Sequence, residues 1–163
     1  MTAETNLVGT LLRAAIGNNL STYLSEKIWR PFGMEFNGNW QLSEKGGGEF
    51  GGSSLSASLR DYGRIGLFAL RNGRLGDGTQ VLPDNWMADS TAPSKGRAAY
   101  GYLWWLRGEG VYAASGIFGQ AIHIDPVHKL VIAQHSARDA ASQAGDWALQ
   151  REFFRAVTAA LGD

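Results

Sequence analysis

The chain has 163 residues, 44% of them hydrophobic and 18% charged, and its 15 basic and 15 acidic side chains give no net charge. This composition is typical of a globular protein of about one domain. A neutral chain without a basic run disfavours nucleic acid and membrane surfaces as partners. The absence of cysteine excludes disulfides, thiolate metal sites and a cysteine nucleophile. The segment from Met1 to Leu7 lacks the pattern of a secretory leader, which favours the cytoplasm.

Apolar residues recur at helical spacing in the first part of the chain and predict helices over 8–16 and 20–28. Pro31 and Gly33 end the second of these helices. A glycine- and serine-rich stretch over 38–58 predicts a long loop. Ser58 and Asp61 then open a third helix as its N-cap and acidic first turn, and Asn72-Gly73 ends it.

The pattern changes in the second part of the chain. Pro83-Asp84 predicts a short helix that carries Trp86 and has proline at its first position. A period of two over 100–106 predicts a strand, and apolar runs over 118–124 and 130–136 predict a hairpin around the turn 125–129. Helical spacing returns from Trp147 to Leu161.

Helices followed by antiparallel strands and a last helix indicate an α+β fold, in which helices flank an antiparallel sheet. We interpret 1–163 as a single domain. Its first section, 1–95, is mostly helical and contains the glycine-rich loop, and its second section, 96–163, holds the strands and the C-terminal helix.

Two hydrolase motifs are missing from the sequence. Neither Gly51 nor Gly52 begins a complete Gly-x-Ser-x-Gly elbow, and no lysine follows a serine by three positions. The three histidines, His123, His128 and His135, match no spacing of metal ligands, so we expect exposed or hydrogen-bonded strand histidines, no metal and no cofactor.

Two segments near the strands are candidates for binding. The first is an aromatic cluster, which is either a ligand-stacking wall or core packing: Tyr100, Tyr102, Trp104, Trp105 and Tyr112. Alternation sends Trp104 and Trp105 to opposite faces, so one belongs to the core and the other lies under a helix or along a cleft. The second is the small-residue segment 114–120 at the expected beginning of a strand. It either leaves a backbone amide free for a ligand or is a bulge at the strand entry.

Five segments in order resemble the serine β-lactamase and DD-peptidase superfamily, especially its class C-like esterases and 6-aminohexanoate-dimer hydrolases. They are Thr5 to Gly9, Tyr23 to the Pro31-Phe32-Gly33-Met34 turn, Gly51 to Gly66, Ser115 to Gln120, and Asp125 to Ile132. The resemblance implies that 1–163 is a single partial domain, the C-terminal portion of a β-lactamase/transpeptidase-like fold, and that its chemistry is that of a serine hydrolase.

The resemblance also implies which residues act. The third catalytic motif of the family aligns with Ala114, Ser115 and Gly116, so the backbone N–H of Ile117 is expected to help to hold the oxyanion. Phe118, Gln120 and Trp104 are expected to line the acyl pocket. Ala114 stands where the family has a cation, which favours a small amide or ester substrate without a carboxylate.

The resemblance places the nucleophilic serine and its lysine upstream of Met1, and the catalytic tyrosine just before Thr2. We therefore expect the chain alone to be inactive. The apolar face of the last helix would lack part of its cover, which predicts either an N-terminal partner fragment or self-association. The competing hypotheses are a non-catalytic ligand-binding module that uses Trp104 and an inactive product of a truncated gene.

Overall fold

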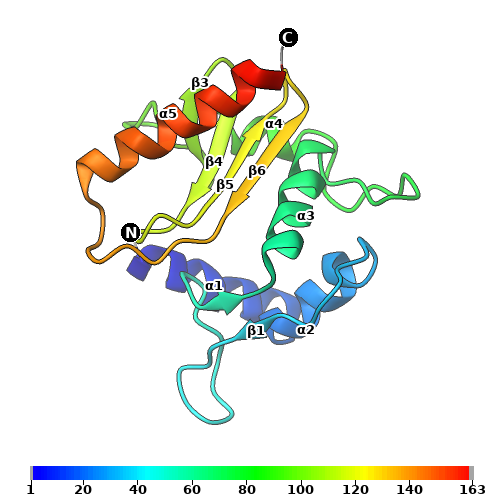
Figure 1. Ribbon diagram of the computed structural model, residues 1–163. Coiled ribbons are helices and arrows are strands. Elements are labelled where there is room, and N and C mark those ends of the chain that lie inside the picture. Colours follow the sequence, from blue (N-terminus) through cyan, green and yellow to red (C-terminus); the bar gives the residue numbers. More distant parts are fainter. Residues whose placement is uncertain (1, 162–163) are drawn as a thin grey trace. The chain divides into compact units, whose positions relative to one another are not determined.

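The structure is a computed structural model that describes residues 2–161, and it contains two compact units, one ending at Asp61 and the other beginning at Tyr62 (Figure 1). The first unit contains α1 (Thr2–Ile16), α2 (Leu20–Leu24), a π-helical turn (Ser25–Trp29), β1 (Asn39–Trp40) and β2 (Leu55–Ser56). Helix α3 (Leu59–Leu70) crosses the boundary. The second unit contains α4 (Trp86–Ser90), β3 (Trp105–Gly108), β4 (Val111–Ser115), β5 (Ala121–Asp125), β6 (Leu130–Gln134) and α5 (Ala144–Leu161). The predicted α+β class is confirmed, whereas the single partial domain stays a prediction.

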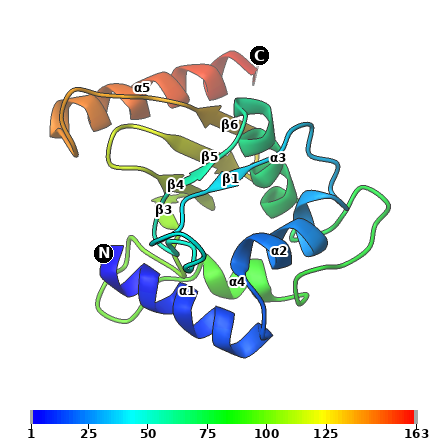
Figure 2. The ribbon, with the colours of Figure 1, turned by 90° about the horizontal axis from the view of Figure 1, so that it is seen from below.

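The first unit confirms both predicted helices and corrects the predicted loop. Helix α1 ends at Ile16, just before Gly17, whose φ of 62° suits glycine, and α2 is the next helix along the chain (Figure 2). Helix α2 runs directly into the π-helical turn. Within 38–58, β1 and β2 pair as a short antiparallel ladder. The ring N–H of Trp40 donates to the carbonyl of Phe50 at 2.9 Å, and this bond helps to fix a segment that has few apolar residues.

One pair of glycines explains why the loop is glycine-rich. A Cβ on Gly9 would lie 2.8 Å from the Cα of Gly51, and a Cβ on Gly51 would lie 2.8 Å from the carbonyl oxygen of Thr5. The backbone of the loop therefore packs directly on α1, and only residues without a side chain permit this approach.

The start of α3 was predicted correctly. The hydroxyl of Ser58 accepts from the amide of Asp61 at 3.1 Å, as an N-cap should. Asp61 is fully buried and also accepts from the amides of Glu35 and Phe36 at 2.8 and 3.1 Å. This carboxylate thus stabilises the helix start and the segment that follows α2.

The second unit is built on an antiparallel sheet with the order β3-β4-β5-β6. One face of this sheet packs against α3 and α4, where the buried core comprises Ala69, Met87, Tyr112, Ile122 and Ile124. On the opposite face, α5 crosses the strands (Figure 1). Phe154 of α5 packs against the ring of His123 on β5, with ring centroids 4.9 Å apart.

Several predicted bounds in this unit are wrong. The strand expected over 100–106 begins only at Trp105, because Leu103 adopts a φ of 67° and the amide of Gly101 bonds to the carbonyl of Trp104. The strand expected over 118–124 begins at Ala121, since the preceding residues form a turn. Strand β4 was not predicted as an element.

The predicted start of α4 is wrong, whereas the predicted hairpin of β5 and β6 is confirmed. Helix α4 begins at Trp86 after the N-cap Asn85, so Pro83 precedes the helix instead of occupying its first position. The predicted hairpin is confirmed: Asp125 accepts from the amides of Val127 and His128 at 3.0 and 3.1 Å and closes the turn between β5 and β6. No helix within residues 2–161 has the length and apolar character needed to cross a membrane.

Two glycines of α3 should respond in opposite ways to alanine. A Cβ on Gly66 would lie 2.5 Å from Val131 Cγ1 and 2.8 Å from Ile122 Cγ2, whereas a Cβ on Gly63 would meet nothing closer than 4.0 Å. We expect Gly66→Ala to lower the free energy of unfolding by about 1–3 kcal/mol through overpacking. Gly63→Ala should raise it by about 0.5–1 kcal/mol through helix propensity. Chemical denaturation of both variants tests this packing, and equal effects would contradict it.

Candidate functional site

The turn between β4 and β5 holds the residues that the sequence singled out. Ser115 ends β4 and pairs with Ala121, so the small-residue segment lies at the end of one strand and not at the beginning of another. The amide of Gly116 donates to the carbonyl of Gln120 at 2.8 Å, and Gly119 closes the turn with a φ of 92°. Ile117 and Phe118 occupy its tip and are 57% and 38% exposed.

The peptide groups around Ile117 have an asymmetric pattern of hydrogen bonds. The carbonyl of Ile117 accepts from the amide of Ser142 at 2.8 Å. Its own N–H has no acceptor within the described part of the chain. Since backbone donors are nearly always paired when buried, a donor left at an exposed turn is available to a ligand or to water.

The turn is fixed from the side of α5. The side-chain amide of Gln150, which is buried, donates to the carbonyl of Gly119 at 2.8 Å, and the amide of Arg138 donates to the carbonyl of Phe118 at 3.3 Å. The guanidinium of Arg138 lies over the ring of Trp147, 4.8 Å from its centroid. It also fills the space beside Gly119, where a Cβ would lie 2.5 Å from its Nε.

Sequence reasoning missed these three supports, Arg138, Ser142 and Gln150. They lie 19 or more positions beyond Gly119 in the sequence, and no local spacing connects them to the turn. Polar residues at these positions carried no signal that distinguishes them from a solvated surface.

The other predicted site residues are distributed on both sides of the sheet. The hydroxyl of Ser115 accepts from Arg107 at 3.2 Å, on the face that carries α5. The side chain of Gln120 lies against Gly116, where a Cβ would be 2.5 Å from Gln120 Oε1. Trp104 packs edge-on against Tyr112 on the core face, with centroids 5.0 Å apart, while Trp105 lines the cavity on the opposite face. The prediction that these two tryptophans face opposite sides is confirmed.

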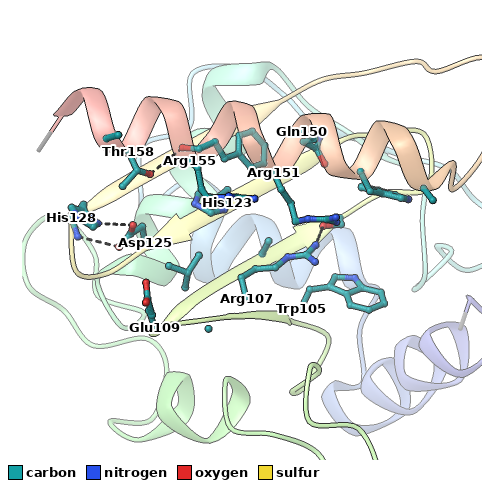
Figure 3. Close-up of a pocket in the computed structure, with 18 of the residues that line it drawn as sticks. Trp105, Arg107, Glu109, His123, Asp125, His128, Gln150, Arg151, Arg155 and Thr158 are labelled. Atoms are coloured by element: carbon teal, nitrogen blue, oxygen red, sulfur yellow. Dashed lines mark hydrogen bonds and ion pairs between the residues drawn. The ribbon is translucent and has the colours of Figure 1, made fainter.

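A cavity of about 890 Å³ lies between α5 and strands β3 and β4 (Figure 3). Its floor is the outward face of the two strands, and its wall is the inward stripe of α5. Close-packed interiors contain few voids larger than a water molecule, so a space of this size is an open surface cleft and not a packing defect. The cavity is lined by Trp105, Arg107, Val111, Ala113, Ser115, Ile117, His123, Trp147, Gln150, Arg151 and Phe154, among others.

Neighbouring charged groups in this cavity shift the pKa values of Asp125 and His123. At one end Asp125 accepts from His128 Nδ1 at 2.7 Å. Burial alone would raise the pKa of Asp125, but its hydrogen bonds to His128 and to the amide of Val127 bring the pKa below its usual value. Burial lowers the pKa of His123; the Asp125 carboxylate opposes this shift, and the Arg107 cation adds to it. Within residues 2–161, no group of three or more carboxylates and imidazoles is placed to hold a metal ion.

Comparison with known proteins identifies the family. The sequence matches the beta-lactamase family over residues 2–153. The chain belongs to the beta-lactamase family. None of the curated protein sequences matches it.

Two solved structures resemble this member of the beta-lactamase family. A protein of Bacillus anthracis, assigned as a 6-aminohexanoate-dimer hydrolase, superposes with a TM-score of 0.84 at 27% identity over 94% of this chain and 42% of its own. A protein of Bacteroides dorei, assigned as a beta-lactamase, gives a TM-score of 0.60 at 17% identity over 89% of this chain and 54% of its own. The second likeness shows the fold alone. The chain spans less than half the length of the first structure.

The support of the turn by Gln150 can be tested directly. Gln150→Leu should leave the carbonyl of Gly119 without its buried donor, which costs about 1–3 kcal/mol. We expect lower stability and faster hydrogen exchange of the amides of 116–119. Leu149→Ala is the matched control, because Leu149 is the preceding residue and is 71% exposed. Equal exchange rates in the two variants would contradict the support.

The lowered pKa of His123 predicts that stability falls in mild acid. Between its folded pKa and the ordinary value of about 6.5, the unfolded chain binds the proton more readily, so the free energy of unfolding decreases as the pH drops through this window. His123→Phe keeps an aromatic ring against Phe154 and removes the titration. We expect denaturation curves from pH 7 to pH 5 to show a shallower decline for this variant. An equal or steeper decline would contradict the prediction.

Proposed function

We propose that this chain is part of a serine hydrolase of small amides or esters, to which it contributes the oxyanion-binding amide of Ile117. The observation that carries the proposal is the N–H of Ile117, which has no acceptor in residues 2–161 and lies at an exposed turn. Membership of the beta-lactamase family and the likeness to a protein assigned as a 6-aminohexanoate-dimer hydrolase support it.

In this proposal the chemistry is acyl transfer. A serine attacks the carbonyl carbon of the substrate, and the negative charge that develops on the carbonyl oxygen is stabilised by two backbone amides. Ile117 provides one of these amides. The hydrogen bonds that fix the carbonyls of Ile117, Phe118 and Gly119 keep the turn in place, and this matters because electrostatic stabilisation depends on donors that are already oriented.

The first residue of the segment 114–116, Ala114, affects which substrates the site can accept. Ala114 packs against the core cluster of the second unit and offers no cation. A substrate whose carboxylate needs an ionic partner would find none at this position. This observation favours neutral amides and esters, with Phe118 and Gln120 beside the acyl group.

The serine and its activating lysine are supplied in this proposal by polypeptide other than 1–163, because the sequence contains no Ser-x-x-Lys motif. An N-terminal fragment that carries this motif is the proposed partner for catalysis. The chain by itself is proposed to be inactive, which is also what an incomplete gene product without a partner would show.

Labelling with a fluorophosphonate probe tests the proposal. We expect no label on this chain alone, and label on the Ser-x-x-Lys fragment when the two are mixed, the fragment coming from the gene region upstream or from the Bacillus anthracis relative. In the mixture, Ile117→Pro removes the N–H and should lower the rate of ester hydrolysis by about 10²–10³-fold. Ile117→Ala keeps the N–H and should change it little. Label on the isolated chain, or equal rates for the two variants, would refute the proposal.

A further inference from the structure

Arg138 contacts both the turn that carries Ile117 and the first turn of α5. Its guanidinium occupies the space beside Gly119, where a Cβ would lie 2.5 Å from Nε and 2.8 Å from Cζ of Arg138. Its Cζ also lies over the ring of Trp147, 4.8 Å from the ring centroid. The side chain of Arg138 is only 14% exposed. A single, largely buried side chain therefore joins the turn to the start of the last helix.

The contact with Gly119 depends on a missing side chain and on a flat cation. Gly119 has a φ of 92°, in the left-handed region that glycine adopts without strain. The planar guanidinium can pack against this bare backbone, which a tetrahedral ammonium group cannot do in the same way. The backbone amide of Arg138 also donates to the carbonyl of Phe118 at 3.3 Å. Arg138 thus contacts the two residues that directly follow Ile117.

The orientation of the guanidinium is fixed by Asp146 in the first turn of α5. Nη2 of Arg138 donates to the carbonyl of Asp146 at 3.0 Å, and Nε lies 3.7 Å from the carboxylate oxygen Oδ2 of the same residue. The ring of Trp147 restricts the guanidinium further. Because the planar fork is held through two of its nitrogens and against a ring, it keeps a defined position beside the turn.

The stability of α5 alone does not account for an arginine in this place. A helix dipole favours negative charge at the N-terminal turn, which Asp146 provides and the cation of Arg138 opposes. The nitrogen Nη1 of Arg138 is buried and has no acceptor within residues 2–161, and a buried donor without a partner is unfavourable. The contacts with Phe118 and Gly119 give this side chain a role that helix stability does not.

We propose that Arg138 is a positioning residue for the amide of Ile117. Its guanidinium and its backbone amide hold Gly119 and Phe118 in place, so that the N–H of Ile117 is already oriented when the substrate binds. The inference rests on the proposed function, and it assigns no contact between Arg138 and the substrate. Preoriented donors contribute most to oxyanion stabilisation, and a displacement of about 1 Å can cost about 10²-fold in rate.

Hydrogen exchange followed by NMR tests the structural step on this chain without any activity. Arg138→Met keeps a long side chain and removes the guanidinium. We expect the hydrogen-bonded amides of Gly116 and Gly119 to exchange about five times faster or more, while the amides within β5 stay unchanged. Arg74→Met is the matched control, because Arg74 belongs to the same unit and also lies 3.7 Å from a carboxylate, that of Asp84.

Ester hydrolysis by the chain mixed with the Ser-x-x-Lys fragment tests the functional step. Rates are divided by the amount of enzyme that the fluorophosphonate probe labels at saturation, so that misfolded protein does not count. Arg138→Met should lower kcat by about 10–100-fold with little change in KM, because the lost orientation acts in the transition state. The affinity for a boronic acid, which forms a tetrahedral adduct with the serine, should fall by a similar factor. Arg74→Met should change neither.

Arg138→Lys separates shape from charge. It keeps the cation but not the flat fork, so we expect it to be as slow as Arg138→Met. Full activity of the lysine variant, a loss that appears in KM alone, or unchanged exchange of Gly116 and Gly119 would overturn the inference. A loss with Ile117→Pro but none with Arg138→Met would refute the positioning role alone, whereas no loss with either would refute the proposed function together with it.

Discussion

A β-sheet with apolar side chains on both faces needs cover on both, and in this chain the two faces are covered to different degrees. On one face α3 and α4 enclose a core that contains the fully buried Ile124. The close approach of α3 depends on Gly66, because a side chain there would collide with Val131 and Ile122. On the other face a single helix, α5, lies over a four-stranded sheet. The well-packed core and the cavity beside α5 both follow from this difference.

The position of α5 also determines the geometry of the turn at Ile117. A five-residue turn with exposed tips has little packing of its own, so its conformation depends on hydrogen bonds from outside. Gln150 provides one from α5, and Arg138 and Ser142 provide two from the segment that leads to it. The orientation of the Ile117 amide is therefore a property of the last thirty or so residues as much as of the turn itself.

Sequence patterns were sufficient for the elements with strong periodicity. Helices α1, α3 and α5 and the hairpin around Asp125 follow from apolar spacing and from capping or turn residues, each of which acts within a few positions. The prediction of a strand from Tyr100 was wrong because the period-two alternation of the sequence continues through a turn. No local sequence signal indicates the positive φ of Leu103 in that turn. The two strands in the glycine-rich segment are only two residues long, too short for a pattern to develop.

In the candidate site, too, the sequence indicates the residues of the turn itself but not the distant residues that support it. The small residues of 114–120 mark a place where backbone groups are accessible, and the resemblance to a family selects Ile117 among them. Long-range partners such as Gln150 could not be found this way, because their contribution depends on how α5 lies over the sheet. The cavity between α5 and strands β3 and β4 is a stronger example, since two of its lining residues, Arg107 and Arg151, are 44 positions apart and become neighbours only in the folded unit.

The cavity beside α5 and the turn at Ile117 are physically connected through Gln150, which lines the cavity and donates a hydrogen bond to the carbonyl of Gly119. A side chain packed against that part of α5 restricts the motion of the helix, and a restricted helix holds its hydrogen-bond donors more firmly. Oxyanion stabilisation loses most of its value when the donor must reorganise during the reaction. In the role proposed for Ile117, the hydrogen bond from Gln150 to the carbonyl of Gly119 thus contributes by holding the turn in place before the substrate arrives.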